Sequence, residues 1–226
     1  MRTVVFDLDG TLADTAADMI AAAYVMFGKL GHGAPLDPVA DAATAFHGGL
    51  AMLRLGYARL GQGDARHVEA GYPVFLQQYK QAVCRESRFY PGAREAVEQL
   101  KSRGIGVAIC TNKPEAPTLA LLDGLGAAGL FDAVIGADTL PSRKPDPAPY
   151  RAAVTRAGGE VGASMMLGDT ETDLATARAV GVPCALVTFG PGAADVAALA
   201  PDALLDGFEA LGGMVDTFLG LAGAEI

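Results

Sequence analysis

Two carboxylates lie two residues apart at the end of a short apolar segment near the start of the chain. Residues 4–6 (Val-Val-Phe) lead into Asp7 and Asp9, and Gly10 and Thr11 follow where a turn should begin. Alternate side chains of a strand point the same way, so both acids can face one site. Adjacent acids repel each other unless a cation lies between them, or unless one is a nucleophile and the other an acid/base group. A strand ending in an Asx-type turn is the alternative, and this segment alone does not decide between them.

Three further segments place polar side chains where a predicted strand ends. Thr111 and Asn112 could donate hydrogen bonds to a phosphate oxygen. Lys144 lies between a predicted strand and a helix that Pro147 could start; nearby prolines would fix its position, and it could bind an anion. Asp169 and Asp173 add two acids, which favours a shared divalent metal ion. Each has a plainer explanation, namely helix capping or, for Lys144, an ordinary surface lysine. Four such groups at one edge of one sheet are hard to explain in that way.

The elements that must position these groups alternate along the chain. Strands are predicted at residues 3–8, 106–111, 133–136, 165–168 and 184–188, and helices at residues 92–103, 115–125, 147–157, 173–180 and 208–218. This alternation predicts an α/β fold with a Rossmann-like parallel sheet covered by helices on both faces. The carboxyl ends of such strands meet at one edge, which would gather the polar groups.

Residues 15–88 interrupt this alternation, because they show apolar residues at helical spacing and no convincing strand. A connection this long, with its own apolar faces, predicts an inserted all-α cap subdomain. The core would then comprise residues 1–14 and 89–226. Because the insert begins directly after the turn that carries Asp7 and Asp9, it is placed to act as a lid.

Composition limits the possible partners. The 226 residues carry a net charge of −9 and no basic run, which disfavours binding to nucleic acid, and a small anionic substrate would need a local cation. Three dispersed cysteines without a CxxC pair favour a reducing compartment, and we expect a cytoplasmic protein with no signal peptide and no membrane span. All three histidines lie in the insert, which disfavours a histidine nucleophile. His47 could contact a substrate, but a surface position on a cap loop is the favoured interpretation.

Together the four polar segments resemble the haloacid dehalogenase superfamily of phosphohydrolases, and the resemblance covers essentially the whole chain. Its motifs match residues 7–11, Thr111-Asn112, Lys144-Pro145 and residues 168–173. Residues 47–50, 89–92, 111–114 and 137–145 are similar to the group of bacterial phosphoglycolate phosphatases, although related phosphatases and pyrophosphatases share several of these features. Asp146 departs from that group, which frequently has histidine there.

The resemblance implies a Mg²⁺-dependent phosphomonoester hydrolase that acts on a small phosphorylated metabolite, with 2-phosphoglycolate as the best candidate. Asp7 would be the nucleophile and Asp9 the general acid and base. Mg²⁺ would be bound by the Asp7 carboxylate, the Asp9 backbone carbonyl and Asp169, with Asp173 orienting a ligand or a water. The phosphate would be bound by Thr111, Asn112 and Lys144 and by backbone donors of the turn at Gly10 and Thr11. Lys144 would also act in catalysis, because it and the metal ion would spread the charge of the transferring phosphoryl group.

Other functions remain open at this point. Within the superfamily these are another phosphatase, a pyrophosphatase or a sugar-phosphate mutase. A dehalogenase needs no second acid, so Asp9 disfavours it. A phospho-acceptor signalling module also uses an acidic cluster and a lysine on a parallel sheet, but the large insert and Asp9 favour rapid turnover instead. The intact motifs disfavour a catalytically inactive binding protein, and the sequence does not indicate the oligomeric state.

Overall fold

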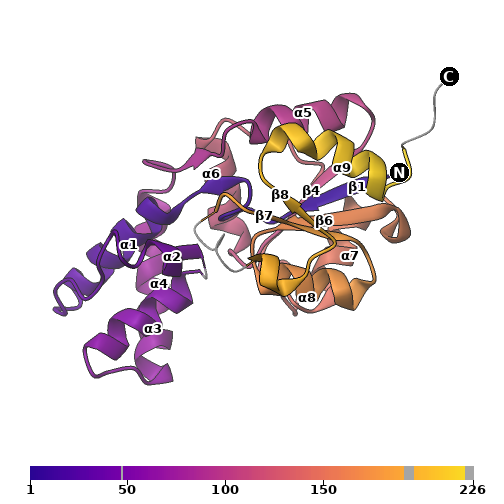
Figure 1. Cartoon of the computed structure of the whole chain (residues 1–226). Helices are drawn as coiled ribbons and strands as arrows, with labels where there is room; N and C mark the ends of the chain where they lie inside the picture. Colours follow the sequence, from indigo (N-terminus) through magenta and orange to yellow (C-terminus); the bar gives the residue numbers. More distant parts are fainter. Residues whose placement is uncertain (47, 191–195, 222–226) are drawn as a thin grey trace.

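The computed structural model describes residues 1–46, 48–190 and 196–221 of the chain. Its centre is a six-stranded parallel sheet of order β5-β4-β1-β6-β7-β8 (Figure 1). The strands are β1 (Thr3–Phe6), β4 (Gly106–Cys110), β5 (Ala133–Ile135), β6 (Ser164–Gly168), β7 (Cys184–Val187) and β8 (Ala203–Leu205). The chain starts in the middle, adds β4 and β5 on one side, and then crosses to β6 on the other. The carboxyl ends of β1, β4 and β6 are therefore neighbours at the point where the strand order reverses, which is where open α/β sheets bind ligands.

Helices cover both faces of the sheet, which confirms the predicted fold class. They are α5 (Ala93–Ser102), α6 (Glu115–Gly124), α7 (Pro147–Arg156), α8 (Glu171–Val180) and α9 (Leu211–Phe218). In β1, Val4 and Phe6 pack into the core shared with α5, α6 and α9, whereas Val5 packs on the opposite face with α7 and α8. All three side chains are fully buried, and burial on both faces explains why the strand is apolar without alternation.

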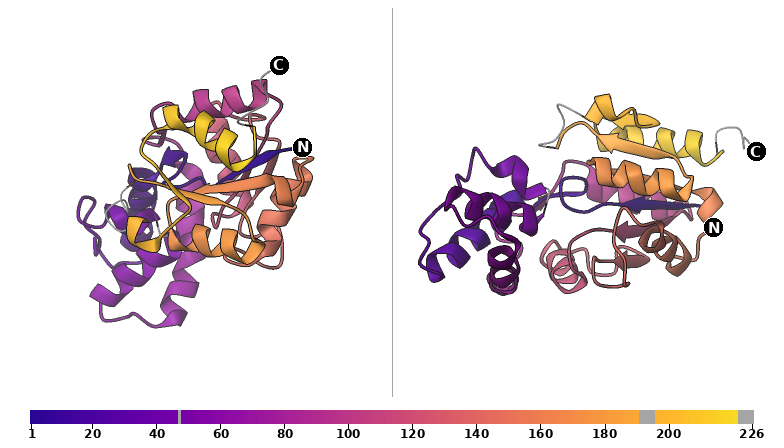
Figure 2. Two further views of the ribbon diagram at one scale, coloured as in Figure 1. Left: turned by 45° about the vertical axis from the view of Figure 1, so that its right-hand side comes forward. Right: turned by 90° about the horizontal axis from the view of Figure 1, so that it is seen from below.

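The insert is a separate helical layer beyond the carboxyl edge of the sheet (Figures 1 and 2). It contains α1 (Ala16–Lys29), α2 (Ala42–Phe46), α3 (Gly49–Arg59) and α4 (Ala65–Gln81). These helices enclose their own apolar core, in which Phe27 and Tyr57 pack edge to face with ring centroids 5.0 Å apart. Among the described residues, no helix is long and apolar enough to cross a membrane.

Two short strands join the insert to the sheet. The strand β2 (Ala13–Asp14) pairs antiparallel with β3 (Arg88–Phe89), so the outgoing and returning chains lie side by side. The buried Asp18 of α1 strengthens this junction by accepting hydrogen bonds from the backbone N–H groups of Glu86 and Ser87 and from the Ser87 hydroxyl. The division at residues 14/15 and 88/89 stays a prediction.

Candidate active site

The end of β1 and the turn after it place the first two acids. The Asp7 N–H donates to the Leu167 carbonyl of β6 at 2.9 Å, which extends the parallel pairing to the strand end. Gly10 then turns the chain with φ +84°, a conformation that costs glycine little. Asp7 is buried and Asp9 is partly exposed, so the two acids face different surroundings.

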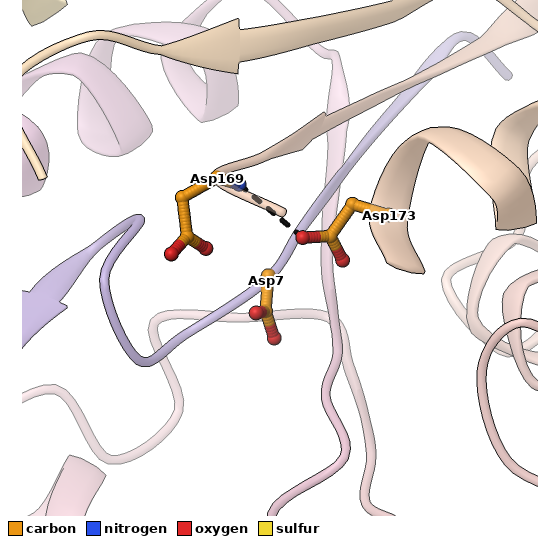
Figure 3. Close-up of side chains that lie close together, drawn as sticks. All are labelled: Asp7, Asp169 and Asp173. Carbon is orange, nitrogen blue, oxygen red and sulfur yellow. Dashed lines mark hydrogen bonds between the residues drawn. The ribbon is translucent and has the colours of Figure 1, made fainter. Parts of the chain in front are cut away.

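Three carboxylates converge beside β1 and β6 (Figure 3). Oxygens of Asp7, Asp169 and Asp173 all lie within 4.8 Å of one another, and the side chains come from the ends of the two strands and the first turn of α8. Gly168 makes this approach possible, because a Cβ there would lie 2.4 Å from Cβ and Cγ of Asp173. The structure thus brings together three acids that are far apart in the sequence.

Asp173 is held rigidly at the start of α8. Its Oδ2 accepts hydrogen bonds from the Thr170 hydroxyl at 2.6 Å and from the backbone N–H groups of Thr170 and Asp169 at 3.1 and 3.2 Å. Thr170 is the N-cap and forms a capping box with Asp173. Capping and the acidic cluster therefore coexist, and both Asp173 oxygens are occupied, because Oδ1 accepts from Lys144.

Lys144 is the one cation among the described residues that contacts this cluster. Its Nζ lies 2.6 Å from Asp173 Oδ1 and 3.0 Å from Asp7 Oδ1, although the contact with Asp7 is an ion pair without hydrogen-bond geometry. Lys144 is buried and lies in the loop before α7. This helix starts at Pro147, with Asp146 as its N-cap. Three carboxylates against one ammonium leave two negative charges without a cation.

The pKa values reflect this imbalance. Burial raises the pKa of Asp7, Lys144 lowers it, and the charges of Asp173 and Asp9 raise it again, with a net pKa of about 6. Burial, then the charges of Asp7 and Asp173, raise the pKa of Asp169 well above its usual value. Burial lowers the pKa of Lys144, but the Asp173 and Asp7 carboxylates outweigh it and keep the ammonium charged.

The donor set fits a hard divalent cation. Carboxylate oxygens are the ligands that such ions prefer, and a charge of +2 would balance the two negative charges left by Lys144. Asp7 Oδ1 is buried and accepts no hydrogen bond from the described residues, so apart from its ion pair with Lys144 it has capacity for a metal ion. The cluster of Asp7, Asp169 and Asp173 could therefore bind a divalent metal ion.

Asp9 faces away from this cluster toward the cap. Its Oδ1 accepts a hydrogen bond from Thr15 Oγ1 at 2.5 Å and contacts Lys113 Nζ at 2.7 Å. Lys113 is buried, and its Nζ also lies 4.6 Å from the centre of the Tyr79 ring of α4. Burial lowers the pKa of Lys113, but Asp9 outweighs that effect and raises it above the usual value.

The sequence pattern predicted no role for Lys113 or Thr15. The signal for Lys113 was its position next to Asn112 at the carboxyl end of β4, the strand beside β1, with Pro114 limiting the loop. Thr15 gave no comparable signal, because its contact with Asp9 depends on how the cap helix α1 leaves the core.

The predicted phosphate-binding residues separate into two groups. Thr111, Asn112 and Lys144 line a common cleft, and the Asn112 side-chain amide donates to the Lys144 carbonyl at 3.1 Å, which ties the two loops together. Gly10 and Thr11 are not among the lining residues. The Thr11 hydroxyl instead donates to Asp169 Oδ1 at 2.8 Å, so its position suits a residue that orients a metal ligand.

The cleft has a volume of about 760 Å³ and lies between the sheet edge and the cap. Asp7, Asp9 and Lys113 line it from the core, and Tyr72, Phe75 and Tyr79 of α4 line it from the cap. The sequence prediction for His47 concerns a residue outside the described ranges. A buried carboxylate beside a cation-binding cluster, open to a lidded cleft, is suited to attack on an electrophile that carries negative charge.

Fold and site together define an α/β phosphohydrolase with a helical cap. The chain belongs to the haloacid dehalogenase-like hydrolases, whose family model matches residues 1–181. It is a phosphatase of this family, and hydrolases of the family typically use a divalent metal ion.

Similarity extends over most of the chain. A phosphoglycolate phosphatase of Rhodospirillum rubrum is 38% identical over 216 residues, which cover 93% of this chain and 89% of the relative. A phosphoglycolate phosphatase of Cereibacter sphaeroides is 40% identical over 193 residues, covering 84% and 86% of the two chains. The crystal structure of a predicted phosphoglycolate phosphatase from Haemophilus somnus superposes with a TM-score of 0.82 at 23% identity, covering 95% of this chain and 97% of that one, and supports the fold.

Proposed function

We propose that this protein is a Mg²⁺-dependent phosphatase that hydrolyses 2-phosphoglycolate through a phosphoenzyme at Asp7. The observation that carries the chemistry is the buried group of Asp7, Asp169 and Asp173, two negative charges in excess, at the base of the cleft. The substrate is inferred from the relatives named phosphoglycolate phosphatase, which are 38% and 40% identical. The expected cytoplasmic location stays a prediction.

Mg²⁺ would be bound by the carboxylates of Asp7 and Asp169 and by the backbone carbonyl of Asp9. When bound, it supplies positive charge beside the oxygens of the transferring phosphoryl group. Asp173 supports this site from behind, because its oxygens already accept hydrogen bonds from Thr170, from the Asp169 N–H and from Lys144. Its role is to position the neighbouring groups.

Asp7 would attack the phosphorus, forming an Asp7 oxygen–phosphorus bond as the ester phosphorus–oxygen bond breaks. Asp9 would donate a proton to the leaving glycolate oxygen and then accept one from the water that hydrolyses the aspartyl-phosphate, which releases phosphate and restores Asp7. Asp9 would have to rotate toward the reacting atoms, because its carboxylate now contacts Thr15 and Lys113. Lys144 would stabilise charge on the phosphoryl oxygens as well as on Asp7.

Phosphate release from a panel of phosphate esters tests this proposal. The panel contains 2-phosphoglycolate, glucose 1- and 6-phosphate, a nucleoside monophosphate and pyrophosphate, each with Mg²⁺ and with EDTA. We expect 2-phosphoglycolate to be preferred, EDTA to stop turnover and Mg²⁺ to restore it. Asp7→Asn should lower kcat by at least about 10⁴-fold, as expected when a covalent nucleophile is lost. Asp123→Asn, an exposed position on α6, is the matched control and should leave kcat unchanged.

Each alternative gives a different result in the same assay. Full activity of Asp7→Asn would remove Asp7 as the nucleophile, and turnover in EDTA would contradict the metal site. Exchange between the glucose phosphates with little phosphate release would identify a mutase. A phospho-aspartate that persists for minutes would favour a signalling module.

A further inference from the structure

Two arginines face the cleft without an acidic partner. Arg54 of α3 lines it from the cap, and Arg143 lines it from the loop that leads to Lys144. Among the described residues, neither forms an ion pair or a side-chain hydrogen bond. Arg59, the other arginine of α3, contrasts with them, because it contacts Asp41 at 2.5 and 2.7 Å. A guanidinium without a counter-ion beside the active site of an acidic protein is available to an anionic ligand.

The helix itself explains why Arg54 has no partner. Residues three and four positions away on a helix are neighbours, and for Arg54 these are Leu50, Ala51, Tyr57 and Ala58, none of which is acidic. Leu50 and Ala51 also line the cleft, so Arg54 lies on the cleft-facing side of α3. Nothing on its own helix competes for its guanidinium.

Arg143 approaches the same space from the core. Burial raises the pKa of Tyr72 on the cap, the nearby positive charges of Lys113 and Arg143 lower it, and Asp138, an acid that also lines the cleft, raises it. Arg143 is therefore close enough to act electrostatically across the cleft on α4. Tyr72 stacks on Phe75 with ring centroids 6.1 Å apart, so this part of the cap wall is aromatic and carries no acid.

The lysines of the site already contact its own acids. Lys144 is shared by Asp7 and Asp173, and Lys113 is paired with Asp9. A substrate that carries a carboxylate as well as its phosphate would bring a further negative charge toward these acids. It needs a cation that the active site does not already use, and the arginines at the cleft meet that need.

We propose that Arg54 is a specificity-determining residue that binds the anionic group of the substrate other than the transferring phosphate. This inference rests on the proposed function, in which that group is the carboxylate of 2-phosphoglycolate. A guanidinium matches a carboxylate by two parallel hydrogen bonds, and Arg143 adds positive charge from the core. Arg54 belongs to the cap. It would therefore stabilise a cap closed over a substrate with two anionic groups more than a cap closed over an ester whose second group is uncharged.

The test compares two esters in each variant. 2-Phosphoglycolate carries the carboxylate, whereas ethyl phosphate has an uncharged tail, so the ratio of their kcat/KM values isolates recognition of the carboxylate. We expect Arg54→Gln to lower this ratio by about 10- to 100-fold, chiefly by weakening the binding of the carboxylate ester, because a charge-assisted hydrogen bond is lost. Arg54→Lys should recover part of the ratio. Arg66→Gln removes an arginine of the cap outside the cleft and should leave the ratio as in the wild type.

The outcomes separate the inference from the proposed function. If the wild type prefers 2-phosphoglycolate and Arg54→Gln keeps that preference, the role of Arg54 is refuted while the substrate stands. The same holds if Arg143→Gln, and not Arg54→Gln, lowers the ratio. If the wild type hydrolyses both esters equally well, the proposed substrate fails and the inference fails with it. An equal loss on both esters in Arg54→Gln would show a general structural effect and would also refute the role.

Discussion

Substitution of Thr11 tests how the Asp169 carboxylate of the candidate metal site is held in place. Its buried hydroxyl donates to Asp169 Oδ1 at 2.8 Å, the only hydrogen bond that the described residues give to this carboxylate. Thr11→Val keeps the shape of the side chain and removes this donor. A hydrogen bond to a charged group contributes about 1.5–3 kcal/mol, which corresponds to roughly 10- to 100-fold in an equilibrium constant. We expect Thr11→Val to weaken Mg²⁺ binding by about that factor, as loss of a group that orients a metal ligand does.

The assay is the rate of phosphate release as a function of free Mg²⁺ concentration at saturating substrate. In Thr11→Val the half-saturating Mg²⁺ concentration should rise about 10- to 100-fold, while kcat at saturating Mg²⁺ stays within a few-fold of the wild type. Thr176→Val is the matched control. The Thr176 hydroxyl is also buried in this region but donates to the Thr172 carbonyl at 2.7 Å, so its loss should not change the Mg²⁺ requirement.

One result would refute the reasoning about Thr11. The sequence predicts that Thr11 helps to bind the phosphate. If the Thr11 hydroxyl itself binds the phosphate, Thr11→Val will raise KM for the ester at saturating Mg²⁺ and leave the Mg²⁺ requirement unchanged. A role in holding Asp169 therefore shifts the Mg²⁺ titration, whereas a role in binding phosphate shifts the substrate titration.

Two further predictions concern packing and protonation in the same cluster. Gly168→Ala should destabilise the protein by about 1–3 kcal/mol, because the new Cβ would overlap Asp173, whereas Gly162→Ala, with open space around it, should have little effect on the Tm. The second follows from the raised pKa of Asp7, about 6, and of Asp169. Asp7 binds its proton more tightly in the folded state than in the unfolded state. Its contribution to the stability of the metal-free protein is therefore lost as the pH rises from about 4 to 6. Mg²⁺ needs the ionised carboxylates, so it should raise the Tm more at pH 7.5 than at pH 5, and equal shifts in a thermal melt would contradict this.

The sequence predicted the core well because its strands are buried on both faces. An uninterrupted apolar run such as residues 3–6 followed by a turn leaves few alternatives, and Pro147 starts α7 as expected from its fixed φ. The acids at the ends of β1 and β6 could be placed together for the same reason. Parallel strands that share a carboxyl edge bring their last residues into one site, whatever the length of chain between them.

The sequence did not predict the elements or element ends that lack a clear hydrophobic periodicity. The edge strand β8 has three residues, of which Leu205 is the buried one, so no alternation is visible. In the last part of the insert, apolar residues at helical spacing are frequent only from Tyr72 onward, but α4 begins at Ala65 with Asp64 as its N-cap. Its first turns are mostly polar and Pro73 lies inside the helix, so the pattern becomes apolar only where α4 reaches the cap core.

Side-chain partners were harder to predict than side-chain positions. Both Thr11 and Thr111 are threonines near strand ends, and the resemblance places both at the phosphate, Thr11 through the backbone of its turn and Thr111 through its side chain. In the structure Thr111 lines the cleft, whereas Thr11 turns inward to Asp169. The difference depends on the turn that Gly10 makes with positive φ, which a strand-and-helix pattern does not specify.

The distribution of cations connects these observations to substrate choice. Lys144 and Lys113 each contact acids of the site, so their charges are already opposed by those of Asp7, Asp173 and Asp9. Two negative charges remain in the cluster, and under the proposed function a divalent metal ion would balance them and supply positive charge to the phosphate. A second anionic group on the substrate has no cation left at the base of the cleft. Its recognition must therefore come from the rim, where Arg54 arrives with the cap. Chemistry at the sheet edge and choice of substrate at the cap are thus separated by charge as well as by fold.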